Sequence, residues 1–263
     1  MIELRNVSKY YGDTPALEDI SAKLQNGRVY AVLGHPGAGK STLLRLLAGV
    51  LDADVGTVKI NGFDMRREPA AAKRCIGYLP DEEFGYEDMT VTEYLVFVAS
   101  ARGLSYERAV RRAHDAVELG GLEQDRNRLL SAISTSARCR LGIVQALLGK
   151  QDILLLDEPF ADPNPRRVAE ERELLRTVAQ NKTVFFTTSD VSEAKKLADH
   201  VLLLAEGKLI LSLPMEEAGD TLGDQFRSYK PTAAATKAAG RKRSVPERDG
   251  EYELIDEDGG DRA

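Results

Sequence analysis

Gly34-His35-Pro36-Gly37-Ala38-Gly39-Lys40-Ser41-Thr42 decides the fold of this chain, because it fits the phosphate-loop pattern G-x-x-x-x-G-K-[ST]. Residues 28–33 before it are mostly apolar, as in a buried strand, and residues 41–48 after it have the spacing of a helix. A chance glycine-rich turn would not be expected in this context. The glycines let backbone N–H groups turn inward around phosphate oxygens, and the helix N-terminus adds the positive end of its dipole. The stretch therefore predicts that the chain binds a nucleoside triphosphate.

Two further groups of residues complete the expected site. Lys40 is placed to reach the outer phosphates, and the hydroxyl of Ser41 is placed to ligate Mg²⁺. An apolar strand, Ile153 to Leu156, ends in the carboxylates of Asp157 and Glu158. The first acid at such a strand end holds Mg²⁺, usually through water, and the second can polarise a water molecule against the γ-phosphate. The catalytic candidates are therefore Lys40 and Glu158, and the first metal candidates are Ser41 and Asp157.

The composition limits the class of protein. The formal net charge is −6, which gives no reason to expect a basic surface for nucleic acid. No apolar segment follows a basic start at the N-terminus, and no apolar run is long enough to cross a bilayer. Cys75 and Cys139 lack metal-ligand spacing and fit reduced thiols. We therefore expect an intracellular protein that reaches a membrane only through a partner.

The order of the expected elements predicts an α/β fold. The first segments alternate between apolar and polar side chains and are separated by turns, which favours a small antiparallel β region. Later strands alternate with helices, a pattern typical of a parallel sheet with crossover helices. The expected strands are residues 2–7, 17–24, 29–33, 57–60, 75–79, 153–156, 183–187, 202–204 and 208–213, and the expected helices are residues 41–48, 91–120, 138–148 and 166–179.

A change of composition near residue 228 predicts where the folded domain ends. Beyond it aliphatic residues become sparse, Arg241-Lys242-Arg243 is basic and residues 251–261 are strongly acidic. Segments of this kind bury too little apolar surface to offset the entropy of ordering. We expect one domain over residues 1–227, with a helical subdomain at about 88–150, and a disordered charged tail over residues 228–263.

With these motifs in this order, residues 2–225 resemble the ATP-binding subunit of an ATP-binding cassette (ABC) transporter. The most similar group serves polyketide, multidrug, lipopolysaccharide and gliding-motility exporters. The resemblance implies a P-loop NTPase of the ABC ATPase type, with a mostly parallel sheet core, an N-terminal antiparallel β subdomain and a helical subdomain. It also implies ATP and Mg²⁺ as ligands, a membrane permease as partner, and a cytoplasmic position on the inner face of the cell membrane. Tyr11, before Gly12, matches the aromatic residue that stacks on adenine in the family, with Tyr10 as the neighbouring candidate.

The family's signature segment, LSGGQ, corresponds to Ile133-Ser134-Thr135-Ser136-Ala137. In the family this segment contributes backbone amides to the γ-phosphate held by the opposite subunit of a homo- or heterodimer. Ser134 is retained, whereas Thr135 and Ser136 replace the two glycines. Because glycine permits close approach, the Cβ of Ser136 predicts a looser clamp on the partner's ATP.

Three switch positions of the family also differ. Asp81 stands where the family has a glutamine that senses Mg²⁺; it can still meet the metal, or its charge can weaken ATP binding. Pro163-Asn164 stands where a Leu-Asp step usually communicates across the dimer, and Asn164 can keep hydrogen bonds without the charge. Ser189 replaces the switch histidine and is too short to bridge the γ-phosphate, water and Glu158, so we expect a lower rate.

Other side chains have plainer interpretations. His35 occupies a variable position of the phosphate loop and is expected to face solvent or to pack, and His200 is expected to make structural hydrogen bonds. Phe84, Tyr86 and Met89 are apolar residues in a polar loop. They favour local packing and a surface for the membrane partner about equally.

The departures leave two functions open. In the first, the chain is a working but slow ATPase that drives a permease, because the binding, metal and base residues survive. In the second, it is a non-hydrolysing ATP-binding module that acts as a structural or regulatory clamp, and pairing with a standard subunit would fit this role. A small-molecule kinase shares only the phosphate loop and is disfavoured. We favour retained ATP binding with weak hydrolysis.

Overall fold

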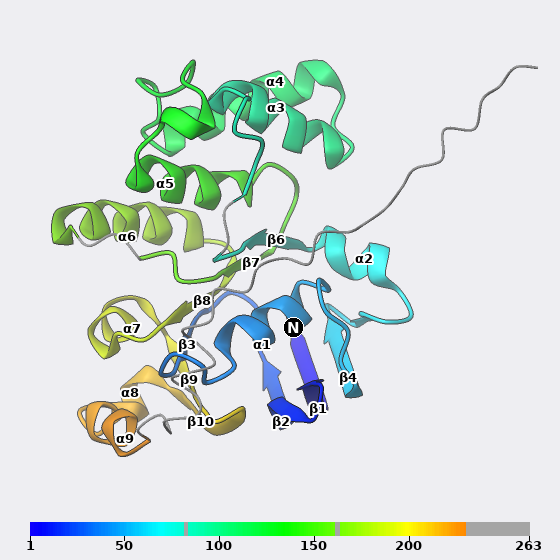
Figure 1. Cartoon of the computed structure of the whole chain (residues 1–263), viewed down its shortest axis with the longest axis vertical. Helices are drawn as coiled ribbons and strands as arrows, with labels where there is room; N and C mark the ends of the chain where they lie inside the picture. The colour runs from blue at the N-terminus through cyan, green and yellow to red at the C-terminus, as the bar shows by residue number, and fades with distance from the viewer. Residues whose placement is uncertain (82–83, 161–163, 230–263) are drawn as a thin grey trace, which may run out of the picture.

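The helix that follows the phosphate loop packs against both β-sheets of the protein. The computed structural model describes residues 1–81, 84–160 and 164–229. In it, α1 (Lys40–Leu47) lies between the strands of the two sheets (Figure 1). The leucines of α1 belong to one hydrophobic cluster together with side chains from both sheets. The phosphate loop is therefore carried by a helix whose own apolar face is fixed on two sides.

The larger sheet has six strands in the order β10-β9-β3-β8-β7-β6. All neighbouring strands are parallel except β10, which pairs antiparallel with β9. The carboxyl ends of β3, β7 and β8 consequently meet at one edge of the sheet, where ligands bind in open α/β folds. The strands are β3 (Val29–Leu33), β6 (Ile76–Leu79), β7 (Ile153–Leu156), β8 (Thr183–Thr188), β9 (His200–Ala205) and β10 (Lys208–Pro214).

The smaller sheet confirms the antiparallel β region expected at the N-terminus. It has four strands in the order β2-β1-β4-β5, and each neighbouring pair is antiparallel. Its inward side chains alternate with exposed ones, as expected for a sheet with one buried face. The strands are β1 (Ile2–Tyr11), β2 (Thr14–Leu24), β4 (Val55–Ile60) and β5 (Phe63–Asp64).

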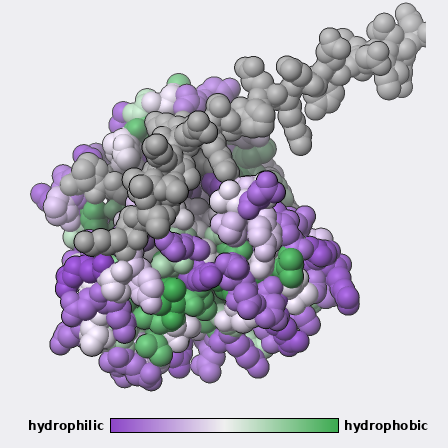
Figure 2. Space-filling model, turned by 60° about the horizontal axis from the view of Figure 1, so that its bottom comes forward, coloured by the Kyte–Doolittle hydropathy of each residue, from purple (hydrophilic) through white to green (hydrophobic). Residues whose placement is uncertain are grey.

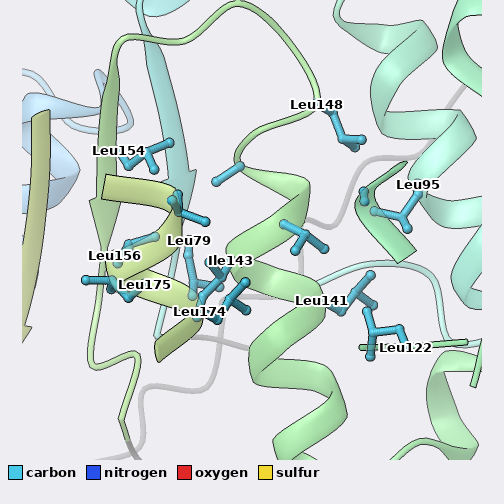
Figure 3. Packing of buried hydrophobic residues seen from close by; sticks show 14 of the residues in the cluster. Leu79, Leu95, Leu122, Leu141, Ile143, Leu148, Leu154, Leu156, Leu174 and Leu175 are labelled. Atoms are coloured by element: carbon cyan, nitrogen blue, oxygen red, sulfur yellow. The ribbon is translucent and has the colours of Figure 1, made fainter. Parts of the chain in front are cut away.

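A helical unit lies at the other end of the molecule, at the top of Figure 1. It contains α3 (Val91–Ala101), α4 (Tyr106–Leu119), the short 3₁₀ helix η1 (Leu130–Ala132) and α5 (Thr135–Gln145). Figure 3 shows α5 with Leu141 on the side of Leu95 and Leu122, and with Ile143 on the side of Leu79 and Leu156. Because these residues form one buried cluster, α5 fastens the helical unit to the larger sheet.

Several boundaries differ from the sequence-based expectation. The helix expected over residues 91–120 is two helices, interrupted around Gly103, which has φ +87°. The helix expected from residue 138 begins three residues earlier, because the Ser134 hydroxyl accepts the Ala137 N–H at 3.1 Å and caps it. The segment expected to be a tail lies outside the described residues from residue 230 onward.

The remaining helices lie at the left of Figure 1, except α2, which lies at the right. Only α6 was expected from the helical spacing; the others are too short to show a clear period. A bidentate ion pair, with Arg172 Nε and Nη2 each 2.8 Å from the carboxylate of Glu193, fastens α6 to α7. These helices are α2 (Pro69–Arg74), α6 (Pro165–Ala179), α7 (Val191–Leu197), α8 (Met215–Ala218) and α9 (Leu222–Ser228).

Among the described residues, twelve large apolar side chains are exposed. None of the helices within the described ranges is both long enough and apolar enough to span a bilayer. The face shown in Figure 2 is mostly hydrophilic, with hydrophobic side chains gathered in a limited area. On the helical unit, Tyr86 and Phe97 form an edge-to-face pair with centroids 5.4 Å apart and remain 54% and 43% exposed. Phe84 and Met89 pack instead against the buried cluster.

Candidate active site

The phosphate loop connects β3 to α1 and is held from both sides. Gly39 precedes α1 with φ +102°, a conformation that residues with a Cβ rarely adopt. A Cβ there would also lie 2.6 Å from the Ala16 carbonyl oxygen and 2.8 Å from Leu17 Cδ2, both in β2. At the other end of the loop, the Gly34 N–H donates to the Thr188 carbonyl at 3.3 Å. Only glycine at position 39 therefore lets the loop lie flat against the smaller sheet.

Lys40 points back into the loop that precedes it. Its side chain is 7% exposed, and Nζ donates to the Gly34 carbonyl at 3.0 Å. The same ammonium forms an ion pair with Glu158 Oε1 at 3.1 Å. A nearly buried cation at the mouth of this loop is positioned to meet the outer phosphates of a nucleotide.

Asp157 follows β7 and faces the start of α1. It is 2% exposed, and its Oδ1 accepts hydrogen bonds from Ser41 Oγ at 3.1 Å and from Thr187 Oγ1 at 2.6 Å. Burial raises the pKa of the Asp157 carboxyl above its ordinary value, and these two hydrogen bonds oppose the rise. The negative charges of Asp81 and Glu158 raise this pKa further. The Asp81 side chain is exposed, and its contact with a metal stays a prediction.

The oxygen atoms around Ser41 and Asp157 fit a bound Mg²⁺. Asp157 Oδ2 is buried and accepts no hydrogen bond from the described part of the chain. A buried carboxylate oxygen of this kind needs a cation or an ordered water. Within that part of the chain, no three His, Cys, Asp or Glu side chains come together as a metal site. The donor set therefore suits a metal shared with phosphate oxygens and water, with Ser41 and Asp157 as the protein's contribution.

Glu158 has an unusual backbone conformation that aims its side chain at the phosphate loop. Its φ of +47° lies in the left-handed region, which is uncommon for a residue with a Cβ. The Glu158 N–H donates to Thr187 Oγ1 at 2.7 Å, and the side chain remains 30% exposed. Its carboxylate is therefore accessible from the loop side, as a general base for a phosphate-bound substrate must be.

The signature residues lie away from this cluster, at the start of α5. Ser134 caps the helix and is exposed with Thr135, but Ser136 is 3% exposed. Its hydroxyl donates to Glu171 Oε1 of α6 at 3.3 Å, so its side chain points into the protein. The looser clamp predicted from the Cβ of Ser136 concerns the nucleotide of an opposite subunit, and it stays a prediction. In Figure 1, α5 and α1 lie on opposite sides of the strands β6 to β8.

His35 and Ser189 both border the C-terminal helix α9. The His35 ring stacks on Phe226 with centroids 4.1 Å apart, and its Nε2 lies 3.2 Å from the Phe226 carbonyl oxygen. His35 therefore packs, as expected. Ser189 is exposed and lines a hollow of about 760 Å³ together with residues of α7 and α9. In the described ranges no hydrogen bond joins Ser189 to Glu158.

Two other expected positions have structural partners. Tyr11 is half-buried at the end of β1, beside the turn into β2. Asn164 caps α6, because its Oδ1 accepts the Arg166 N–H at 3.0 Å. Pro163, the other residue of the segment expected to communicate across a dimer, lies outside the described residues.

Sequence reasoning missed Thr187 and Phe226. Thr187 contacts both acids of the site, yet threonine in an apolar strand is an ordinary β-forming residue. Phe226 reaches the phosphate loop from α9, a helix too short to predict from spacing. No local signal marks either residue, because both contacts depend on how distant segments are brought together.

Comparison with known proteins agrees with this geometry. The family model described as ABC transporter matches residues 17–161, more than half of the chain. The daunorubicin/doxorubicin resistance ATP-binding protein DrrA of Streptomyces peucetius is 33% identical over 90% of this chain and 72% of its own length. The ABC transporter ATP-binding protein NatA of Bacillus subtilis is 31% identical over 87% of this chain and 96% of its own length.

Solved structures confirm the ABC ATPase fold. The ATP-binding cassette MJ0796, in a dimeric post-hydrolysis state bound to ADP and phosphate, matches with a TM-score of 0.75 and 22% identity. The match covers 82% of this chain and 99% of that cassette. One conclusion follows from the site and from the comparisons. The chain belongs to the ABC transporter family as an ATP-binding subunit, and it is an ATPase.

Proposed function

We propose that this subunit binds ATP with Mg²⁺, hydrolyses it slowly with Glu158 as the base, and drives a membrane permease. Slow turnover follows from Ser189, whose exposed side chain is too short to reach the γ-phosphate as an imidazole would. The observation that carries the proposal is the convergence of Lys40, Ser41, Asp157 and Glu158 at one loop. Ser41 Oγ lies 3.1 Å from Asp157, and Lys40 Nζ lies 3.1 Å from Glu158.

The residues divide the work between charge neutralisation and proton transfer. When ATP enters the loop, the Lys40 ammonium moves its interaction from Glu158 to the outer phosphate oxygens. Glu158 is then free to accept a proton from the water that attacks the γ-phosphate. Ser41 and Asp157 would hold Mg²⁺, which neutralises charge on the β- and γ-phosphates when bound.

A second ATP-binding subunit is needed to close the site. Helix α5, which carries the signature segment, lies across the strands β6 to β8 from α1 in Figure 1. One chain therefore cannot bring its own signature residues to its own nucleotide. A homo- or heterodimer, with Ser134 and Thr135 exposed at the start of α5, supplies them from the opposite subunit. MJ0796 forms a dimer of this family's cassettes.

The proposed partner of this ATPase is a membrane permease, whose transport is driven by ATP hydrolysis. Relatives named for drug resistance and for Nod factor export favour an exporter. The exposed pair Tyr86 and Phe97 offers an apolar contact on the helical unit, where such a partner would dock. The subunit would then lie on the cytoplasmic face of the membrane, held there by the permease.

The test is ATP turnover of the purified full chain, measured beside equilibrium ATP binding with and without Mg²⁺. Glu158→Gln should keep ATP binding and lose turnover by about 100-fold or more. The matched control is Glu170→Gln, because Glu170 is an exposed carboxylate in a surface pair with Arg166, 3.7 Å away.

The other outcomes separate the alternatives. Wild-type turnover in Glu158→Gln would show that the base is another group. Tight ATP binding by the wild type without turnover, even in the presence of a permease, would favour the clamp function over the transport function.

A further inference from the structure

Thr187 lies between the phosphate loop and the two acids. It is on β8, which is hydrogen-bonded to β3 on one side and to β7 on the other. Thr187 pairs with Val32 of β3, and the preceding residue Phe186 pairs with Leu156 of β7. The strand that precedes the loop and the strand that precedes Asp157 are therefore both neighbours of Thr187.

The Thr187 hydroxyl acts both as a hydrogen-bond donor and as an acceptor. It donates to Asp157 Oδ1 at 2.6 Å and accepts the backbone N–H of Glu158 at 2.7 Å. The residue is 0% exposed, so water cannot replace either bond without a change in packing. One side-chain oxygen thus joins the carboxylate of the first acid to the backbone of the second.

These two bonds fix the directions in which the acids point. With Ser41 and Thr187 both on Oδ1, the other oxygen of Asp157 is the one that remains available. The Glu158 backbone is held at φ +47°, a conformation that needs support from its surroundings. Losing the bond to Thr187 would leave the Glu158 N–H without its acceptor and free the backbone to relax.

We propose that Thr187 is a positioning residue for ATP hydrolysis, because its hydroxyl aims Asp157 at the metal position and Glu158 at the attacking water. This inference rests on the roles proposed above for Asp157 and Glu158. It goes beyond them because it assigns to a residue of β8 the orientation of both Asp157 and Glu158. It matters most in this chain, where Ser189, directly after β8, makes no hydrogen bond to Glu158 within the described ranges.

The alternative is that Thr187 only satisfies buried polar groups and stabilises the fold. Thr187→Val keeps the shape and removes the hydroxyl, whereas Thr187→Ser keeps the hydroxyl and removes a methyl group. Thr183→Val is the matched control. Thr183 is on the same strand, is 2% exposed, and accepts the Gly27 N–H at 2.9 Å far from the acids.

For the full chain, three quantities are measured: turnover at saturating ATP, ATP affinity without Mg²⁺, and the Mg²⁺ concentration that half-saturates Mg²⁺-dependent ATP binding. We expect Thr187→Val to lower turnover by about 10- to 100-fold and to raise the half-saturating Mg²⁺ concentration about 5-fold. ATP affinity without Mg²⁺ should stay within about 3-fold of wild type. Thr187→Ser should keep turnover and the half-saturating Mg²⁺ concentration close to wild type, and Thr183→Val should change none of the three quantities.

Three results would overturn the inference. One is a folded Thr187→Val protein with wild-type turnover and Mg²⁺ dependence; another is Thr187→Ser being as impaired as Thr187→Val. The third is an equal loss in Thr183→Val. If Thr187→Val does not fold, Thr187→Cys has a weaker donor and gives the same comparison with Thr187→Ser. Glu158→Gln is measured in parallel: if it retains turnover, the role proposed for Glu158 fails, while Mg²⁺-dependent binding still decides the effect of Thr187 on Asp157.

Discussion

Lys40 and Glu158 form an ion pair, with Nζ 3.1 Å from Oε1. The proposed phosphate-binding lysine is therefore paired with the proposed general base. ATP must compete with Glu158 for this lysine. Both side chains are therefore restrained before the nucleotide arrives. With the roles proposed above, nucleotide binding releases Glu158 to act as the base. The pair links occupancy of the loop to the availability of Glu158.

Removing this competition should tighten ATP binding. In Glu158→Gln, Lys40 loses its counter-ion and the loop loses a negative charge, so we expect the Kd for ATP to fall by about 3- to 10-fold. Equilibrium titration with ATP at low ionic strength measures the change, and high salt should reduce it. An unchanged or weaker affinity would contradict the competition.

The close contact at Gly39 should make that position intolerant of a side chain. Gly39→Ala places a Cβ 2.6 Å from the Ala16 carbonyl, so we expect ATP binding to be lost and stability to fall by about 2–4 kcal/mol. Gly12→Ala is the control, because Gly12 also has a positive φ, +59°, but no atom lies within 4 Å of its added Cβ. Urea unfolding and ATP titration separate the clash from the backbone strain, and equal effects of the two variants would refute the clash.

Placing an imidazole directly after β8, where the family has its switch histidine, should raise the rate of ATP turnover. In Ser189→His, the ring can reach the space between Glu158 and the γ-phosphate, and one added hydrogen bond to charged groups corresponds to an increase of about 10-fold in turnover. Ser192→His places the same ring on α7 in the same hollow and should leave turnover unchanged. Steady-state phosphate release measures both variants; equal rates for wild type and Ser189→His would show that Ser189 does not limit the rate.

The pair between Arg172 and Glu193 should contribute measurably to stability. Its two 2.8 Å bonds join α6 to α7 with side chains 15% and 9% exposed, so Arg172→Gln should cost about 1–3 kcal/mol. Arg166→Gln breaks a surface pair with Glu170, whose side chains are 89% and 53% exposed, and should cost about 0–1 kcal/mol. Chemical denaturation of both variants measures the loss in unfolding free energy of each. Equal losses would show that burial of the Arg172–Glu193 pair does not matter.

His200 should make stability fall below neutral pH. Burial lowers its pKa below the ordinary value of 6.5, and the positive charge of Arg28 lowers it further, while Glu217 opposes. Because the unfolded chain binds the proton more readily, the contribution is complete above pH 6.5 and is lost as the pH falls toward the folded pKa. We expect His200→Gln, which can still meet Ser212, to reduce the difference in unfolding free energy between about pH 7.5 and about pH 5.5.

The control for this pH dependence is His114→Gln. His114 is 66% exposed and lies 3.8 Å from Glu118 on the outside of α4. Its removal should leave the slope between the two pH values as in the wild type. A slope that responds to His114 and not to His200 would assign the effect to surface charge.

The sequence predicted the parts of the site whose positions follow from chain order. The loop follows β3 and the acids follow β7, so parallel strands bring Lys40 and Glu158 to one edge by topology alone. It could not predict contacts that depend on side-chain packing between distant segments. Thr187 meets Glu158 across 29 residues and Ser136 meets Glu171 across 35. Neither Thr187 nor Ser136 stands in a local sequence pattern that would identify its partner.

The stack of Phe226 on His35 joins positions separated by 191 residues. The last described helix therefore forms part of the wall of the phosphate loop. A rearrangement of the loop around a nucleotide would tilt the imidazole and, with it, the Phe226 ring and α9. An optical probe attached to the exposed surface of α9 would thus report what happens at the loop, without any label near the nucleotide itself.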